Sequence, residues 1–126
     1  MAVEEMNIKI IKEKITQEEL KKYCDAWFED MVKIVIDVEQ EKIAIGGELH
    51  ADAEKIMIEN GSGQEYRWGA NIYPFNSSND RIEFTAMVNI KPHLDNPSME
   101  ILDENIKCKI QELVEKYIIN ADEKLV

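Results

Sequence analysis

Cysteine, proline, glycine and histidine are all scarce in this chain of 126 residues, which contains two, three, five and two of them, respectively. Cys24 and Cys108 stand far apart and lack the close spacing of a zinc site. We therefore expect two buried, reduced thiols, with a disulfide or a redox pair as the alternative. Reduced thiols are typical of a cytoplasmic protein.

Long hydrophobic runs are also missing. The longest uncharged apolar runs span only a few residues, whereas a membrane-spanning helix needs about 20. Residues 1–5 have neither the basic start nor the apolar stretch of a signal peptide. These absences predict a cytoplasmic chain without a membrane segment.

The chain also has few positively charged residues. Fifteen Lys and Arg residues face 26 Asp and Glu residues, which leaves a net charge of −11. Binding to nucleic acid or to an anionic membrane needs clustered Lys and Arg, so both classes of partner are disfavoured. The negative electrostatic potential of such a chain favours a cation, a basic partner or a neutral small molecule. The charge can also serve solubility alone.

What the sequence does contain fits one α+β domain over residues 1–126, with 44% apolar and 33% charged residues. A capping box at residues 16–19 and an apolar stripe behind it predict a helix to about Glu29. Asp103 is expected to cap a second helix, which carries its own apolar stripe to Ile118. Residues 119–126 are expected to be a frayed tail.

Alternating apolar residues predict the strands. A first short strand is expected at residues 6–11, and residues 31–38 and 42–45 are expected to form a hairpin around a tight polar turn. Residues 64–73 and 81–90 predict two further strands, and 98–101 a short edge strand. The expected order is strand, helix, four-strand meander, helix: a mainly antiparallel sheet with the helices packed on one face.

The segment at residues 46–54 has a distinctive pattern, because every second residue after two glycines is acidic or histidine. In a strand, Glu48, His50, Asp52 and Glu54 would form one polar ladder. Residues 48–59 also fit a helical stripe that Asn60 and Gly61 would end. We favour a bent strand and keep the helix as the alternative.

Strand parity places further polar residues on the same sheet face as this ladder. The predicted ligand-binding surface consists of Glu48, His50, Asp52, Asn71, Tyr73 and Asn89, and Thr85 shares their parity. A divalent metal such as Mn²⁺, Mg²⁺, Fe²⁺ or Zn²⁺ is a possible cofactor, held by His50, Asp52 and Glu54. An ordinary solvated sheet face explains the same pattern without any site.

Three segments stand out in combination: GGELHADAE at residues 46–54, WGANIYP at 68–74 and NPSMEI at 96–101. Together they resemble a family of small bacterial and archaeal proteins of unknown function, over residues 8 to 118. The resemblance implies a stand-alone small domain, and it assigns no activity, cofactor or catalytic residue.

The function is therefore not established by the sequence. The leading hypothesis is a small cytoplasmic module that binds a ligand or a protein through its polar sheet face and self-associates as a homodimer. The alternative is a divalent-metal-dependent hydrolase or related enzyme centred on His50, Asp52 and Glu54. Whether the chain is an enzyme stays open at this point.

Overall fold

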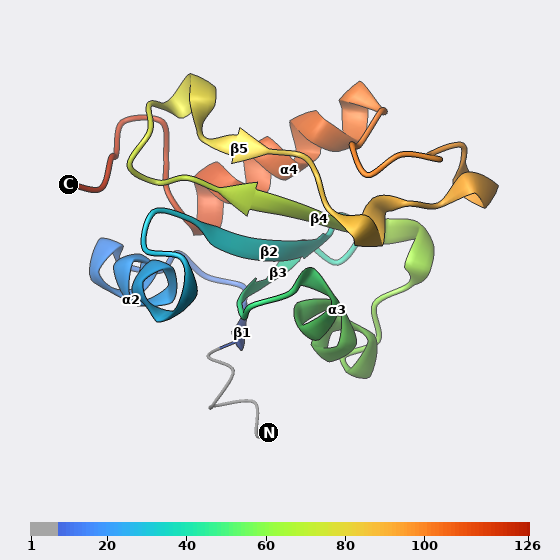
Figure 1. Cartoon of the computed structure of the whole chain (residues 1–126), viewed down its shortest axis with the longest axis horizontal. Helices are drawn as coiled ribbons and strands as arrows, with labels where there is room; N and C mark the ends of the chain where they lie inside the picture. The colour runs from blue at the N-terminus through green and yellow to red at the C-terminus, as the bar shows by residue number, and fades with distance from the viewer. Residues whose placement is uncertain (1–7) are drawn as a thin grey trace.

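The computed structural model describes residues 8–126; the first two residues of the strand predicted at 6–11 lie outside them. Five strands form one antiparallel sheet in the order β1-β3-β2-β4-β5 (Figure 1). The strands are β1 (Ile8–Ile11), β2 (Val32–Asp37), β3 (Lys42–Gly46), β4 (Arg67–Ile72) and β5 (Ile82–Glu83). The helices are α2 (Gln17–Trp27), α3 (His50–Glu59) and α4 (Glu104–Tyr117). The α+β class and the antiparallel sheet are as predicted.

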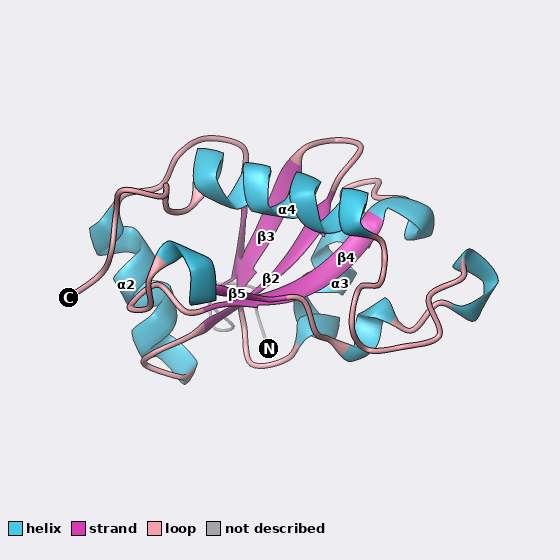
Figure 2. Cartoon of the chain, turned by 90° about the horizontal axis from the view of Figure 1, so that it is seen from above, coloured by secondary structure: helices cyan, strands magenta, loops and turns pink. Residues whose placement is uncertain are grey.

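Both helices predicted from apolar stripes form, and they cover the same face of the sheet. The Thr16 hydroxyl accepts a hydrogen bond from the backbone N–H of Glu19, and the Asp103 carboxylate caps α4 in the same way. Leu20 of α2 and Ile110 of α4 belong to one buried core with Ile34 of β2. Figure 2 shows α4 crossing over the strands.

Residues 48–59 contradict the favoured prediction, because they form no bent strand. Gly46 and Gly47, with φ of 110° and 88°, end β3, and α3 begins at His50. Gly61 follows the helix with φ of 87°, as in the alternative interpretation. Ala53 packs with Val35 and Ala44 in a second buried cluster. Neighbouring strand residues point to opposite faces, so α3 covers the face that α2 and α4 leave open, and the helices do not all share one face.

The strand order also differs from a simple meander. β2 and β3 form the predicted hairpin, with Ile36 opposite Ile43. The chain then crosses through α3, and β4 pairs with the other side of β2, with Val35 opposite Gly69. β2 therefore lies at the centre of the sheet, between strands that the α3 crossover connects.

The strand predicted at 81–90 is also shorter than expected. β5 pairs with β4 only through Ile82 and Glu83, after which the chain turns away in 3₁₀ turns at Met87–Asn89 and Pro92–Leu94. One isolated bridge joins Thr85 to Glu100 and is all that forms of the edge strand predicted at 98–101. The candidate site lies on β4 at the point where the chain after β5 leaves it.

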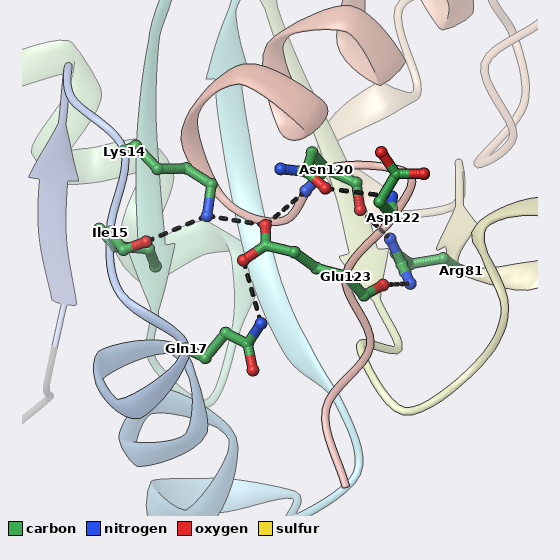
Figure 3. Close-up of polar contacts among 7 residues, drawn as sticks. All are labelled: Lys14, Ile15, Gln17, Arg81, Asn120, Asp122 and Glu123. Atoms are coloured by element: carbon green, nitrogen blue, oxygen red, sulfur yellow. Dashed lines mark hydrogen bonds and ion pairs between the residues drawn. The ribbon is translucent and has the colours of Figure 1, made fainter.

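The end of the chain, for which the sequence predicts fraying, carries a polar network (Figure 3). The Glu123 carboxylate accepts hydrogen bonds from the Asn120 backbone N–H at 2.9 Å and from Lys14 and Gln17 at 2.9 and 3.0 Å. Arg81 donates to the backbone carbonyls of Asn120 and Glu123. These bonds join the C-terminal segment to the start of α2 and to Arg81, the residue before β5.

Two further expectations concern the thiols and the membrane. Cys24 is buried as predicted, but Cys108 is exposed, because it lies on the outer side of α4. Within residues 8–126, none of the helices combines the length and the apolar character that crossing a bilayer requires.

Candidate functional site

A hollow of about 430 Å³ lies where the start of α3, the strands β2, β4 and β5 and the segment after β5 meet. Its size is within the range of small-molecule pockets. The polar residues that line it are Lys33, His50, Asn71, Glu83 and Thr85. The apolar ones are Leu49, Ala51, Ala86, Met87, Val88 and Met99.

Three of the polar residues form one row across the sheet. Lys33 of β2 is directly opposite Asn71 of β4, and Asn71 is directly opposite Glu83 of β5. Directly opposed residues in antiparallel strands point to the same face, with their Cα atoms about 4.5–5.5 Å apart. The hollow therefore has a floor with a cation on one side, an amide in the middle and a carboxylate on the other side.

Asn71 has a free acceptor at the centre of this floor. Its side chain is 7% exposed, and Nδ2 donates to Glu83 Oε1 at 2.7 Å. A carboxylate only accepts, so this bond fixes which end of the amide faces Glu83. The other end, Oδ1, is buried without a hydrogen-bond partner. A buried acceptor left without a donor costs about 1–3 kcal/mol, which a donating ligand would recover.

His50, the first residue of α3, lines the hollow as a neutral imidazole. Its Nε2 donates to the backbone carbonyl of Ala70 at 2.9 Å, which leaves Nδ1 as an acceptor. Burial lowers the pKa of His50, and Lys33 acts in the same direction, whereas Ala70, Asn71 and Glu83 oppose the shift. Because the N–H of the neutral ring is at Nε2, Nδ1 has no proton to donate. His50 therefore leaves Asn71 Oδ1 without a hydrogen bond, even though the two side chains are close.

An apolar rim surrounds the polar floor. Leu49, Met87 and Met99 line the hollow, yet they are 55%, 73% and 43% exposed. Exposed apolar side chains gathered around a concavity are typical of binding sites, and methionine adapts its shape to a ligand. The rim can therefore hold the apolar part of a molecule whose polar end reaches the floor.

The structure separates the six residues of the predicted binding surface. His50 and Asn71 line the hollow together. Glu48 is exposed in the turn before α3, and Asp52 lies in the first turn of α3, outside the lining. The Tyr73 hydroxyl lies 3.5 Å from Glu83 Oε1, at the edge of hydrogen-bond distance.

The sixth residue, Asn89, is fully buried, and its side chain bonds to backbone groups. Oδ1 accepts from the N–H of Gly69, and Nδ2 donates to the carbonyls of Gly69 and Met99. The side chain thus holds the wall of the hollow in place and has no free group for a ligand.

The predicted metal ligands do not converge. In a helix, Asp52 is rotated roughly 200° from His50. Glu54 instead pairs with Arg67, with 3.2 Å between the carboxylate and Nε. Across residues 8–126, no three His, Cys, Asp or Glu side chains come together as a metal site requires.

Lys33, Glu83 and the two methionines of the rim were missing from the predicted surface. Strand parity already places Lys33 on the polar face of its strand, and Glu83 and Met87 on that of theirs. The missing information is the pairing of β2 with β4, which makes these residues neighbours.

The comparisons with known proteins agree with the predicted resemblance to a family of unknown function. A family model described as "Protein of unknown function (DUF5674)" matches residues 9–117. No match was found among curated proteins or among solved structures.

Proposed function

Since the chain belongs to the DUF5674 family of proteins of unknown function, we propose a function from its geometry: a module that binds a small molecule in the hollow beside α3. The observation that carries this proposal is the buried Oδ1 of Asn71, which has no partner in the floor of an apolar-rimmed pocket. A ligand with an N–H or O–H group would satisfy that atom.

The test is a fragment screen by NMR on the ¹⁵N-labelled protein. Fragments that bind are expected to shift the backbone amides of Lys33, Asn71 and Glu83 together, because these residues form the floor. Binding is expected to be lost in Asn71→Leu and kept in Asn79→Leu, a matched change in an exposed turn. Thermal melts report whether each variant is folded.

A second variant guards against a folding defect in Asn71→Leu. Met87 is 73% exposed, so Met87→Lys leaves the core intact while placing a charge on the rim. It is expected to weaken the binding of the same fragments. Fragments that shift other surfaces only, or that bind both variants unchanged, would refute the proposed site.

Self-association in the cytoplasm is a separate part of the proposal. Within residues 8–126, β1 has β3 as its one neighbour, so its outer edge is unpaired and can add a strand from a second copy. Light scattering on a sizing column is expected to show a dimer, favoured by salt because the net charge of −11 repels copies. A monomer at every protein and salt concentration contradicts self-association, and cell fractionation tests the location.

A further inference from the structure

We propose, resting on the proposed function, that the ligand is a small zwitterion, an α-amino acid with an apolar side chain. The cross-strand row of Lys33, Asn71 and Glu83 beneath the rim of Leu49, Met87 and Met99 matches its ammonium, carboxylate and side chain. Each of the three parts of such a ligand meets a complementary group in the pocket.

The ammonium end meets acceptors. Asn71 Oδ1 is buried and has no donor, and one oxygen of Glu83, Oε2, makes no hydrogen bond to residues 8–126. The neutral His50 ring adds a lone pair at Nδ1. A primary ammonium has three N–H donors and a positive charge, so it suits a carboxylate flanked by neutral acceptors.

The carboxylate end meets Lys33. Its ammonium lies 5.1 Å from the centroid of the Phe28 ring and makes no ion pair with Glu83 or with any other described residue. Asn71 separates the two opposite charges in the row, so each is left for a charge of the ligand. A zwitterion satisfies both charges without changing the net charge of the site.

Ligands with only one of the two charges fit less well. A fatty acid offers no donor to Asn71 and brings its carboxylate near Glu83, and like charges at this distance repel. A simple amine satisfies Asn71 and Glu83 but places its charge near Lys33 without a carboxylate to offset it. The apolar rim excludes neither, so the charges decide which ligand binds.

The experiment compares three probes with the same branched apolar chain: L-leucine, isoamylamine, which lacks the carboxylate, and 4-methylpentanoate, which lacks the ammonium. Titration calorimetry is expected to show leucine binding at least tenfold more tightly than either analogue, as one lost charged hydrogen bond predicts. Equal affinity for leucine and either analogue would overturn the zwitterion inference.

Variants assign each charge to its residue. Lys33→Met is expected to weaken leucine binding about tenfold and to bind isoamylamine at least as tightly as the wild type does, while Glu83→Gln weakens the binding of both leucine and isoamylamine. Lys55→Met and Glu59→Gln, matched changes at exposed positions of α3, are expected to leave every affinity unchanged. If Lys33→Met binds leucine with the same affinity as the wild type, the inference is wrong.

The two proposals fail in distinguishable ways. If fragments bind at Asn71 while leucine does not, the zwitterion inference is wrong and the binding function stands. If neither fragments nor leucine shift the amides of the floor, both are wrong.

Discussion

The side-chain amide of Asn89 hydrogen-bonds both backbone groups of Gly69, accepting from its N–H at 2.7 Å and donating to its carbonyl at 3.0 Å. Two hydrogen bonds to one residue are what an adjacent antiparallel strand would provide. β5 has ended by this point, so Asn89 replaces the missing strand neighbour of β4. The arrangement depends on an amide, since it needs a donor and an acceptor together.

Asn89→Ala is expected to destabilise the protein by about 2–4 kcal/mol, because it leaves buried backbone groups of Gly69 without partners. Urea denaturation measures the difference, with exposed Asn79→Ala as the matched control. Asn89→Asp gives a second readout, since its carboxylate would face two carbonyls and accepts only. Its deficit is expected to shrink at acidic pH, where a protonated acid can donate. A wild-type stability for Asn89→Ala would contradict this role.

Gly69 has no room for a side chain. A Cβ there would lie 2.7 Å from Val88 Cγ2, 2.8 Å from Ala86 Cβ and 3.2 Å from His50 Cδ2. Gly69→Ala is therefore expected to cost about 1–3 kcal/mol and to weaken fragment binding, since all three neighbours line the hollow. Gly63→Ala is the control: its φ of −83° suits alanine, and its nearest contacts are at 3.4 Å. Equal melting temperatures for the two variants would contradict the predicted clash.

Lys91 makes stability depend on pH in the alkaline range. The side chain is 1% exposed, donates to the carbonyls of Gln64 and Arg67 and lies 4.2 Å from the centroid of the Trp68 ring. Burial lowers its pKa to about 8, and Arg67 adds to the shift while Glu54 opposes it. The ordinary value of 10.5 applies to the unfolded chain, which therefore holds more protons between pH 8 and 10.5.

Through this window, Lys91 makes the wild type more stable as pH rises, by up to roughly 1.4 kcal/mol per pH unit. The measurement is the difference in unfolding free energy between the wild type and Lys91→Met at pH 7 to 10. Tyr23 and Cys24, whose pKa values burial raises to about 12, titrate in both proteins and cancel in the difference. A difference that stays constant above pH 8 would contradict the prediction.

Glu123 gives a pH dependence of the same sign in the acidic range. The Asn120 backbone N–H, then Lys14 and Gln17, lower its pKa from 4.5 to about 2. Its stabilisation is present above pH 4.5 and lost as pH falls toward 2. The ion pair is partly exposed, so Glu123→Gln is expected to cost only about 1 kcal/mol at pH 7. Urea denaturation at pH 7 and pH 3 should show this deficit shrinking, whereas exposed Glu59→Gln shows none at either pH.

The parts of the fold that could be predicted were those with one unambiguous period. The stripes of α2 and α4 and their caps at Thr16 and Asp103 depend on residues close in sequence. Residues 48–59 were ambiguous, because their apolar residues fit both the bent strand that we favoured and the helix that forms. The deciding factor is tertiary: Val35 and Ala44 present an apolar face that Ala53 of α3 covers.

The site was predictable in part for the same reason. Alternation selected His50 and Asn71, and the structure places both at the hollow, although His50 arrives there on a helix. The row of Lys33, Asn71 and Glu83 depends on which strands pair and in what register. Pairing across the α3 crossover is set by packing over the whole sheet, so local patterns do not contain it.

The early end of β5 has a consequence for how such a site could arise or vanish. Had residues 84–89 continued along β4, they would have lain in the plane of the sheet, the hollow would have lost the wall that Ala86 and Val88 form over Gly69, and Asn89 would have had nothing to replace. The early end of strand pairing at the edge of the sheet thus creates the hollow. The side chain of Asn89 compensates for the backbone hydrogen bonds that β4 loses there. Lengthening that strand by design should remove this wall of the pocket while making the sheet more regular.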